Sequence, residues 1–382
     1  VSNRYLPRRI LLLTGCFARA AAERHSISRL WKQSSGLMAR SVTQNAGDHG
    51  EHYITRDKKE YWAMFYSAAG GGVLIALMAL FKTYLGSIID DKVWKGLAEG
   101  LNYGFGFMVI FMLHFTVATK QPAMTAARFA EAVEKNPQGK TLNMKLAQLL
   151  VDVFRSQSVA VLGNVVVAMG LAALIAFVYQ HQTGEPLMNS ENIAYQLHRI
   201  DPLDGSLWFA AIAGVWLFCS GIISGYFDNR SNYLNMRMRL AQHPLLKKLM
   251  SEKSRVKFAN YMHENYGSLI GNFCFGMLLG LTGLVGYLTH LPLDIRHVAF
   301  SSANLGYSAV SGQFAYPFFL QCIGFVLLIG LVNLMVSFSL TLWVALRSLN
   351  TEIDSWWAIW HEVCQIVRKR PLSLFFPVQL DK

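Results

Sequence analysis

The chain has 382 residues, of which 53% are hydrophobic and only 15% are charged, yet its formal net charge is +12. Soluble domains carry about 25% charged residues and disordered chains are poor in apolar ones, so the composition excludes both classes. Five cysteines are too few for a disulfide scaffold, which leaves an integral membrane protein with basic termini or loops.

The chain begins with a basic region, residues 1–56, which we predict to be a partly helical cytoplasmic segment. Residues 1–60 contain 11 Lys and Arg against 5 Asp and Glu. The apolar run Ile10–Leu13 is too short for the h-region of a signal peptide. Two further regions are expected, a transmembrane domain over 57–347 and a cytoplasmic interfacial helix with a tail over 348–382.

The transmembrane domain is predicted to be an all-α bundle of about six membrane-spanning helices. A span needs about 20 mostly apolar residues, because the hydrocarbon core is about 30 Å thick. The stretches that meet this requirement are Tyr61–Phe81, Leu101–Thr119, Val159–Tyr179, Leu207–Tyr226, Ser268–Leu288 and Pro317–Leu346.

Lys and Arg are unequally divided between alternate connecting segments. The two termini and the segments 120–158 and 227–267 contain 30 of them, whereas the segments 82–100, 180–206 and 291–316 contain 5. By the positive-inside rule, both termini lie in the cytoplasm. The basic cytoplasmic loops could also bind anionic lipid or nucleic acid, but membrane orientation already accounts for their charge.

Residues Thr351–Val367 are predicted to form an amphipathic helix. Its apolar positions recur at helical spacing: Ile353, Trp356, Trp357, Trp360, Cys364 and Val367. Three tryptophans favour a helix that lies in the membrane interface; packing on another subunit is the alternative.

Polar side chains within the predicted spans are candidates for function. Asn164, Asn272 and Asn333 either line a substrate pathway or form hydrogen bonds between helices. His114 lies near the cytoplasmic end of the second span, where an ionisable residue is costly and has either a functional or a structural role.

The segment Leu291–Tyr316 is unusually apolar for a loop. We expect it either to re-enter the membrane or to cover the outer face of the bundle. Asp294, Arg296 and His297 near its start form either a site or a salt-bridged anchor, and both readings stay open.

Several strings resemble those of the bacterial multi-pass membrane family labelled "site-specific recombinase" (gonococcal-recombinase-like), over roughly residues 40–370. They include Gly50–Asp57, Ala68–Gly72, Leu113–Thr125, Ser224–Asn229, Leu291–His297 and Asn333–Phe338. The resemblance implies the membrane-bearing C-terminal part of a longer protein of the bacterial inner membrane. It also points to a candidate cluster of polar residues: His114, Lys120, Gln121, Asp228, Asn229, Arg230, Asp294, Arg296, His297 and Asn304.

The family's label is not matched by a recognisable catalytic constellation. We find no nucleophile framed by basic residues on a compact domain, no metal-binding motif, no phosphate loop and no cofactor signature. The expected function is therefore an envelope, lipid- or solute-handling, transport-like activity. A membrane-tethered role in DNA recombination and a scaffold for a soluble partner are the alternatives, and the oligomeric state is not predicted.

Overall fold

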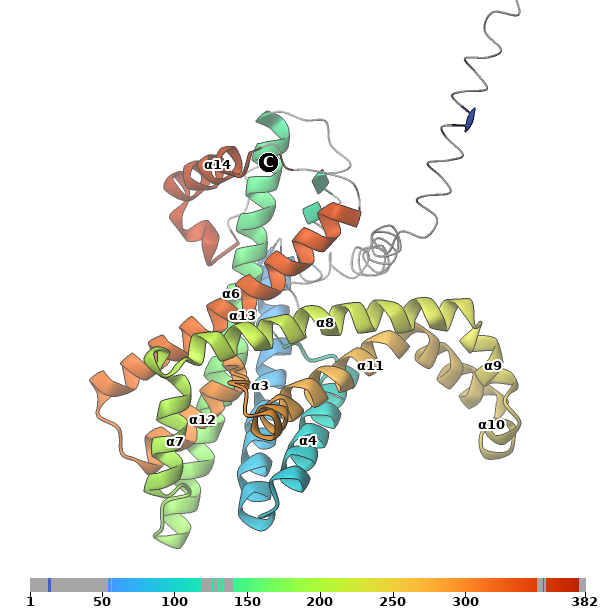
Figure 1. The fold of residues 1–382 in the computed structure, drawn as a ribbon. Coiled ribbons are helices and arrows are strands. Elements are labelled where there is room, and N and C mark those ends of the chain that lie inside the picture. The colour runs from blue at the N-terminus through green and yellow to red at the C-terminus, as the bar shows by residue number, and fades with distance from the viewer. Residues whose placement is uncertain are drawn as a thin grey trace, which may run out of the picture.

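The computed structural model describes residues 13–14, 54–55, 57–117, 125–126, 129–130, 132–133, 140–348, 353 and 355–377. Within these residues all regular structure is helical, which confirms the predicted all-α class (Figure 1). The helices are α3 (Lys58–Ile88), α4 (Lys92–Met112), α6 (Lys140–Thr183), α7 (Ser190–Ile200), α8 (Ser206–Tyr233), α9 (Met236–Gln242), α10 (Pro244–Leu249), α11 (Glu252–Thr289), α12 (Val298–Ser311), α13 (Tyr316–Ser348) and α14 (Trp356–Lys369).

Five of these helices are long and apolar enough to cross a membrane: α3, α6, α8, α11 and α13. They contain five of the six predicted spans. Their N-termini follow ordinary capping chemistry where a cap is present; the Asp57 side chain, for example, accepts a hydrogen bond from the Glu60 amide at 2.8 Å. The chain is therefore a membrane protein by the length and composition of its helices.

The second predicted span, Leu101–Thr119, has the wrong bounds. The helix there is α4, which starts at Lys92 because the Asp91 carboxylate caps the amides of Val93 and Trp94. It ends at Met112, and His114 follows in a left-handed conformation, φ 58°. With Lys92, Lys95 and Glu99 in its first turns, α4 is not among the five apolar helices.

Close helix packing in the bundle depends on glycine. α4 and α11 run antiparallel, and Gly276 of α11 lies against the backbone of Tyr103 and Gly104. Gly280 meets Gly100 in the same way. Because lipid offers no hydrophobic drive for helix association, small residues that let two backbones approach stabilise such a pair.

The segment 290–315 contains α12 (Val298–Ser311), which folds back into the bundle. Ten of its 14 residues are buried, and it packs on α6, α13 and α3. The Tyr307 hydroxyl donates a hydrogen bond to the Ala76 carbonyl of α3 at 3.0 Å. The apolar composition of the segment is thus explained by burial within the protein.

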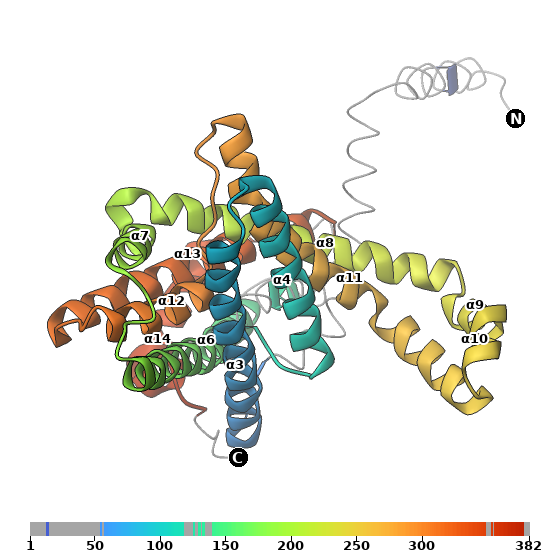
Figure 2. The same ribbon diagram turned by 90° about the horizontal axis from the view of Figure 1, so that it is seen from below.

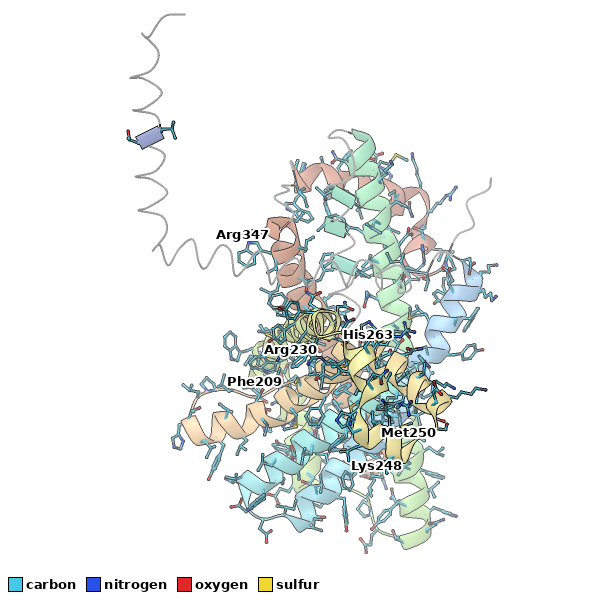
Figure 3. All side chains as sticks on the ribbon, turned by 90° about the vertical axis from the view of Figure 1, so that its right-hand side faces the viewer. Phe209, Arg230, Lys248, Met250, His263 and Arg347 are labelled. Atoms are coloured by element: carbon cyan, nitrogen blue, oxygen red, sulfur yellow. The ribbon has the colours of Figure 1, made fainter. Side chains whose placement is uncertain are left out.

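Two parts extend from the bundle. The adjoining ends of α8 and α11, together with α9 and α10, form an arm that projects from the remaining helices (Figures 1 and 2). Figure 3 shows Lys248 and Met250 at its outer end.

Separately from the arm, α14 packs on α6. It buries Ile359 and Val363 in a cluster with Leu146, Ala147 and Val151 of α6. Ile353 and Val367 of the predicted apolar face pack against this cluster, whereas Trp357 remains 79% exposed and Trp360 58% exposed. Contact of these tryptophans with the membrane interface stays a prediction.

Candidate functional site

A cavity of about 1480 Å³ lies between α3, α4, α7, α11 and the segment that leads into α12. Residues from the basic-poor segments 82–100, 180–206 and 291–316 meet here, and we call this end of the bundle the α7 end. The charged residues that line the cavity are Lys82, Lys92, Lys95, Glu99, Glu191, Arg199 and Asp294.

One ion pair forms where α3 and α4 pack together. The Lys82 ammonium lies 3.0 Å from the Glu99 carboxylate and 5.5 Å from the centre of the Tyr103 ring. A neighbouring hydrogen bond from the Asn102 side chain to the Met78 carbonyl, 2.9 Å long, also joins the two helices. Lys82 and Glu99 are thus held together on one wall of the cavity.

A second charged group on another wall combines α7 with the segment before α12. One carboxylate oxygen of Asp294 lies 2.6 Å from the Arg296 guanidinium and 3.3 Å from that of Arg199. Arg199 also donates a hydrogen bond to the Tyr195 hydroxyl at 2.6 Å, and the Arg296 Nε donates one to the Arg199 carbonyl at 2.6 Å. Two guanidinium groups therefore share a single carboxylate.

These groups carry fixed charges at physiological pH. Burial by itself raises the pKa of Asp294, but the guanidinium groups of Arg199 and Arg296 outweigh it and hold the pKa at about 2. A general acid or base works best with a pKa near the operating pH. The Asp294 group is therefore suited to binding and orienting charge rather than to proton transfer.

The cavity also has an extensive apolar wall. It includes Leu77 and Phe81 of α3, Ile175 of α6 and Leu284 of α11. Leu77 and Phe81 are 45% and 48% exposed although they lie in a candidate span, so this wall continues onto the outside of the bundle.

The structure brings some of the predicted site residues to this cavity. Asp294 and Asn304 line it, and Arg296 contacts Asp294. His297 lies behind it, fully buried among Phe107, Phe275 and Phe300, whose ring centres are 5.8–6.1 Å away. This burial lowers the pKa of His297 to about 3.

Other predicted residues lie away from the cavity lining. His114 is exposed beyond the end of α4, and its carbonyl accepts a hydrogen bond from the Ser67 hydroxyl at 3.0 Å. Asp228 accepts one from the Gly267 amide at 2.8 Å, which ties α8 to α11. Asn229 and Arg230 are exposed on α8, and Lys120 and Gln121 lie outside the described residues.

The three asparagines within the spans form hydrogen bonds to backbone carbonyls. The Asn164 amide bonds the carbonyls of Ala68 and Thr116. Asn333 bonds the carbonyls of Ala210 and Arg296 at 2.8 and 2.9 Å and accepts from the Val298 amide at 3.1 Å. Asn272 donates to the Ser268 carbonyl one turn earlier in its own helix, at 2.7 Å.

Sequence reasoning missed most of the polar lining of the cavity, including Lys82, Lys92, Lys95, Glu99, Glu191, Tyr195 and Arg199. The signal was present in the charge count, because Lys82 directly follows an apolar run and Arg199 is the single base of residues 180–206. The positive-inside rule does not explain Lys and Arg residues in the basic-poor segments, so these residues are candidates for a functional role.

Within the described residues, no group of three or more His, Cys, Asp or Glu side chains is arranged to hold a metal ion. No curated protein sequence and no solved structure is significantly similar to the chain. The sequence profile of one family, described as "Site-specific recombinase", matches residues 3–377. The match covers nearly the whole chain, which therefore belongs to the site-specific recombinase family.

Proposed function

We propose that this membrane protein binds a lipid or solute in the cavity at the α7 end and handles it in a transport-like process of the cell envelope. The observation that carries the proposal is the set of fixed ion pairs in a large cavity with one apolar wall. In this proposal the protein lies in the bacterial inner membrane with both termini in the cytoplasm.

Energetics support a binding role for the charged groups. Partly buried ion pairs gain little net stability over apolar packing, because each charge loses hydration. Pockets with apolar walls and a few fixed polar groups are typical of small-molecule sites. DNA strand exchange, by contrast, needs an activated nucleophile, and neither ion pair provides one.

The proposal can be tested by complementing a deletion strain with variants of the full chain. The double variant Lys82→Met/Glu99→Gln removes the charges of one pair while roughly keeping the side-chain sizes. We expect it to accumulate in the membrane but to leave the envelope or uptake defect of the deletion uncorrected. Asp204→Asn is the control, since Asp204 lies near the same end of the bundle but pairs with His198 outside the cavity lining.

Full complementation by Lys82→Met/Glu99→Gln would contradict the proposal. A deletion strain with a recombination defect and a normal envelope would contradict it as well.

A DNA-acting function is the second candidate, because of the family description and the basic arm. The arm carries Arg237, Arg239, Lys247, Lys248, Lys253, Arg255 and Lys257. This function requires that purified protein bind duplex DNA with an affinity that falls steeply with salt and that neutralising the arm abolishes binding. Absence of binding at low salt would eliminate it. The third candidate, a scaffold for a soluble partner, requires activity that survives all cavity substitutions.

A further inference from the structure

All basic residues of the basic-poor segments gather at the cavity. These segments contain Lys82, Lys92, Lys95, Arg199 and Arg296. The first four line the cavity, and Arg296 is bound to the lining residue Asp294. The lining residues and Arg296 together carry five positive charges. The acidic residues Glu99, Glu191 and Asp294 carry three negative charges, so the positive charges are in excess.

Two of the five bases have no acidic partner in the described part of the chain. The Lys92 ammonium lies 4.1 Å from the centre of the Tyr287 ring, and the Lys95 ammonium lies 3.5 Å from the Gly86 carbonyl. Arg199 shares its carboxylate with Arg296. These three side chains therefore retain donors for an added anion, and guanidinium and ammonium groups are the usual ligands of phosphate.

The size and the apolar wall of the cavity indicate more than a small anion. Its volume of about 1480 Å³ exceeds the roughly 300–1,000 Å³ of typical small-molecule pockets. Leu77, Phe81 and Leu284 lie in candidate spans, and the exposure of the first two connects the cavity with the lipid-facing surface. An occupant can therefore place a charged group on the bases and an acyl chain along this wall.

We infer that the cavity binds an anionic amphiphile, with its phosphate group on Lys92 and Lys95, which lie three positions apart in the first turn of α4, and its chains against Leu77, Phe81 and Leu284. This inference rests on the proposed function and names its ligand class. A phospholipid and a water-soluble organic phosphate share the recognised group, and the apolar wall favours the lipid.

The experiment is a calorimetric titration of the purified full chain in a non-ionic detergent with four probes. These are dihexanoyl-phosphatidylglycerol, dihexanoyl-phosphatidylcholine, glycerol 3-phosphate and inorganic phosphate. We expect the phosphatidylglycerol to bind at least tenfold more tightly than each of the other three. Lys92→Gln/Lys95→Gln should weaken its binding at least tenfold, whereas Lys247→Gln/Lys248→Gln, the same charge change on the arm, should alter it less than twofold.

Each other outcome overturns the inference in a recognisable way. If phosphatidylcholine binds as tightly as phosphatidylglycerol, the ligand need not be anionic. If glycerol 3-phosphate binds as tightly, the ligand needs no acyl chain. In both cases the cavity still binds a ligand. Equal losses in the two lysine variants show that binding is not at the cavity. Absence of binding by every probe overturns the ligand class, while the complementation result for Lys82→Met/Glu99→Gln still decides the proposed function independently.

Discussion

Asp294 is the counter-charge of two guanidinium groups, which makes it the most sensitive single residue of the site. Asp294→Asn leaves Arg199 and Arg296 facing each other, with Arg296 only 8% exposed. Removing one partner of a buried charge pair costs about 3–5 kcal/mol, and the partial exposure of Asp294 places this variant near the lower limit. We expect a clearly lower thermal unfolding midpoint in detergent.

The exposed pair of His198 and Asp204 provides the comparison. Asp204→Asn should cost less than about 1 kcal/mol, as exposed ion pairs do. Equal effects of the two substitutions on the unfolding midpoint would show that Asp294 does not stabilise the protein as the counter-charge of two guanidinium groups.

His297 makes stability depend on pH. Its folded pKa of about 3 lies below the ordinary value near 6.5, so the unfolded chain takes up the proton first as the pH falls. The contribution is complete above pH 6.5 and is lost progressively toward pH 3, by about 2 kcal/mol at pH 5. Asp294, with a pKa of about 2, changes stability only below about pH 4.

The measurement compares unfolding midpoints at pH 7.5 and pH 5. His297→Phe, which replaces the imidazole among Phe107, Phe275 and Phe300 by a ring that cannot be protonated, should reduce the difference between the two midpoints. An unchanged difference would mean that the pH dependence has another origin.

Individual residues show what the sequence could and could not predict at this scale. Asp294 and Arg296 could be singled out because they are two residues apart in an apolar segment. Arg199 is 95 residues from Asp294, and Lys82 is 17 residues from Glu99. Pairs of this kind depend on how helices pack, which hydrophobic periodicity does not specify.

At the scale of elements, the contact between α4 and α11 depends on the absence of side chains. A Cβ at Gly276 would meet the backbone of Tyr103 and Gly104, which cannot move aside as a flexible side chain could. Gly276→Ala should therefore destabilise the protein by about 1–3 kcal/mol, the usual cost of overpacking.

Gly170 of α6 is the matched control, because nothing lies within 4 Å of its added Cβ. Gly170→Ala should be neutral or stabilise the protein by up to about 1 kcal/mol through helix propensity. Thermal midpoints of the two variants should move in opposite directions or differ clearly in size; equal midpoints would argue against the close approach of α4 and α11.

Hydropathy predicted some of the helices correctly and others not. Long apolar runs predicted five spans, because a helix of that length and composition has few alternatives in lipid. The predicted bounds were wrong for α4, whose polar first half packs on α11 through glycines and on α3 through the Lys82–Glu99 ion pair. It also left two alternatives for α12, ten of whose 14 residues are buried by the surrounding helices.

At the scale of the whole molecule, membrane orientation follows from the division of charge between the two ends of the bundle. We expect the α7 end to face outward and the arm with α14 to face the cytoplasm. In a cysteine-free background, a membrane-impermeant maleimide should label Lys92→Cys in intact cells and Lys248→Cys only after permeabilisation. The exposed native Cys364 of α14, retained alone, should behave like Lys248→Cys. Labelling of all three in intact cells would contradict this topology.

The buried position of α12 has a consequence for biogenesis. A 14-residue helix is too short to cross the hydrocarbon core, and its surroundings are formed by α3 and α6, which precede it in the chain, and by α13, which follows. During synthesis from the N-terminus, its receiving surface on α3 and α6 exists before α12 leaves the ribosome, but the surface is closed only when α13 has been inserted. The surroundings of α12 are therefore complete only after a helix made later, α13, has been inserted.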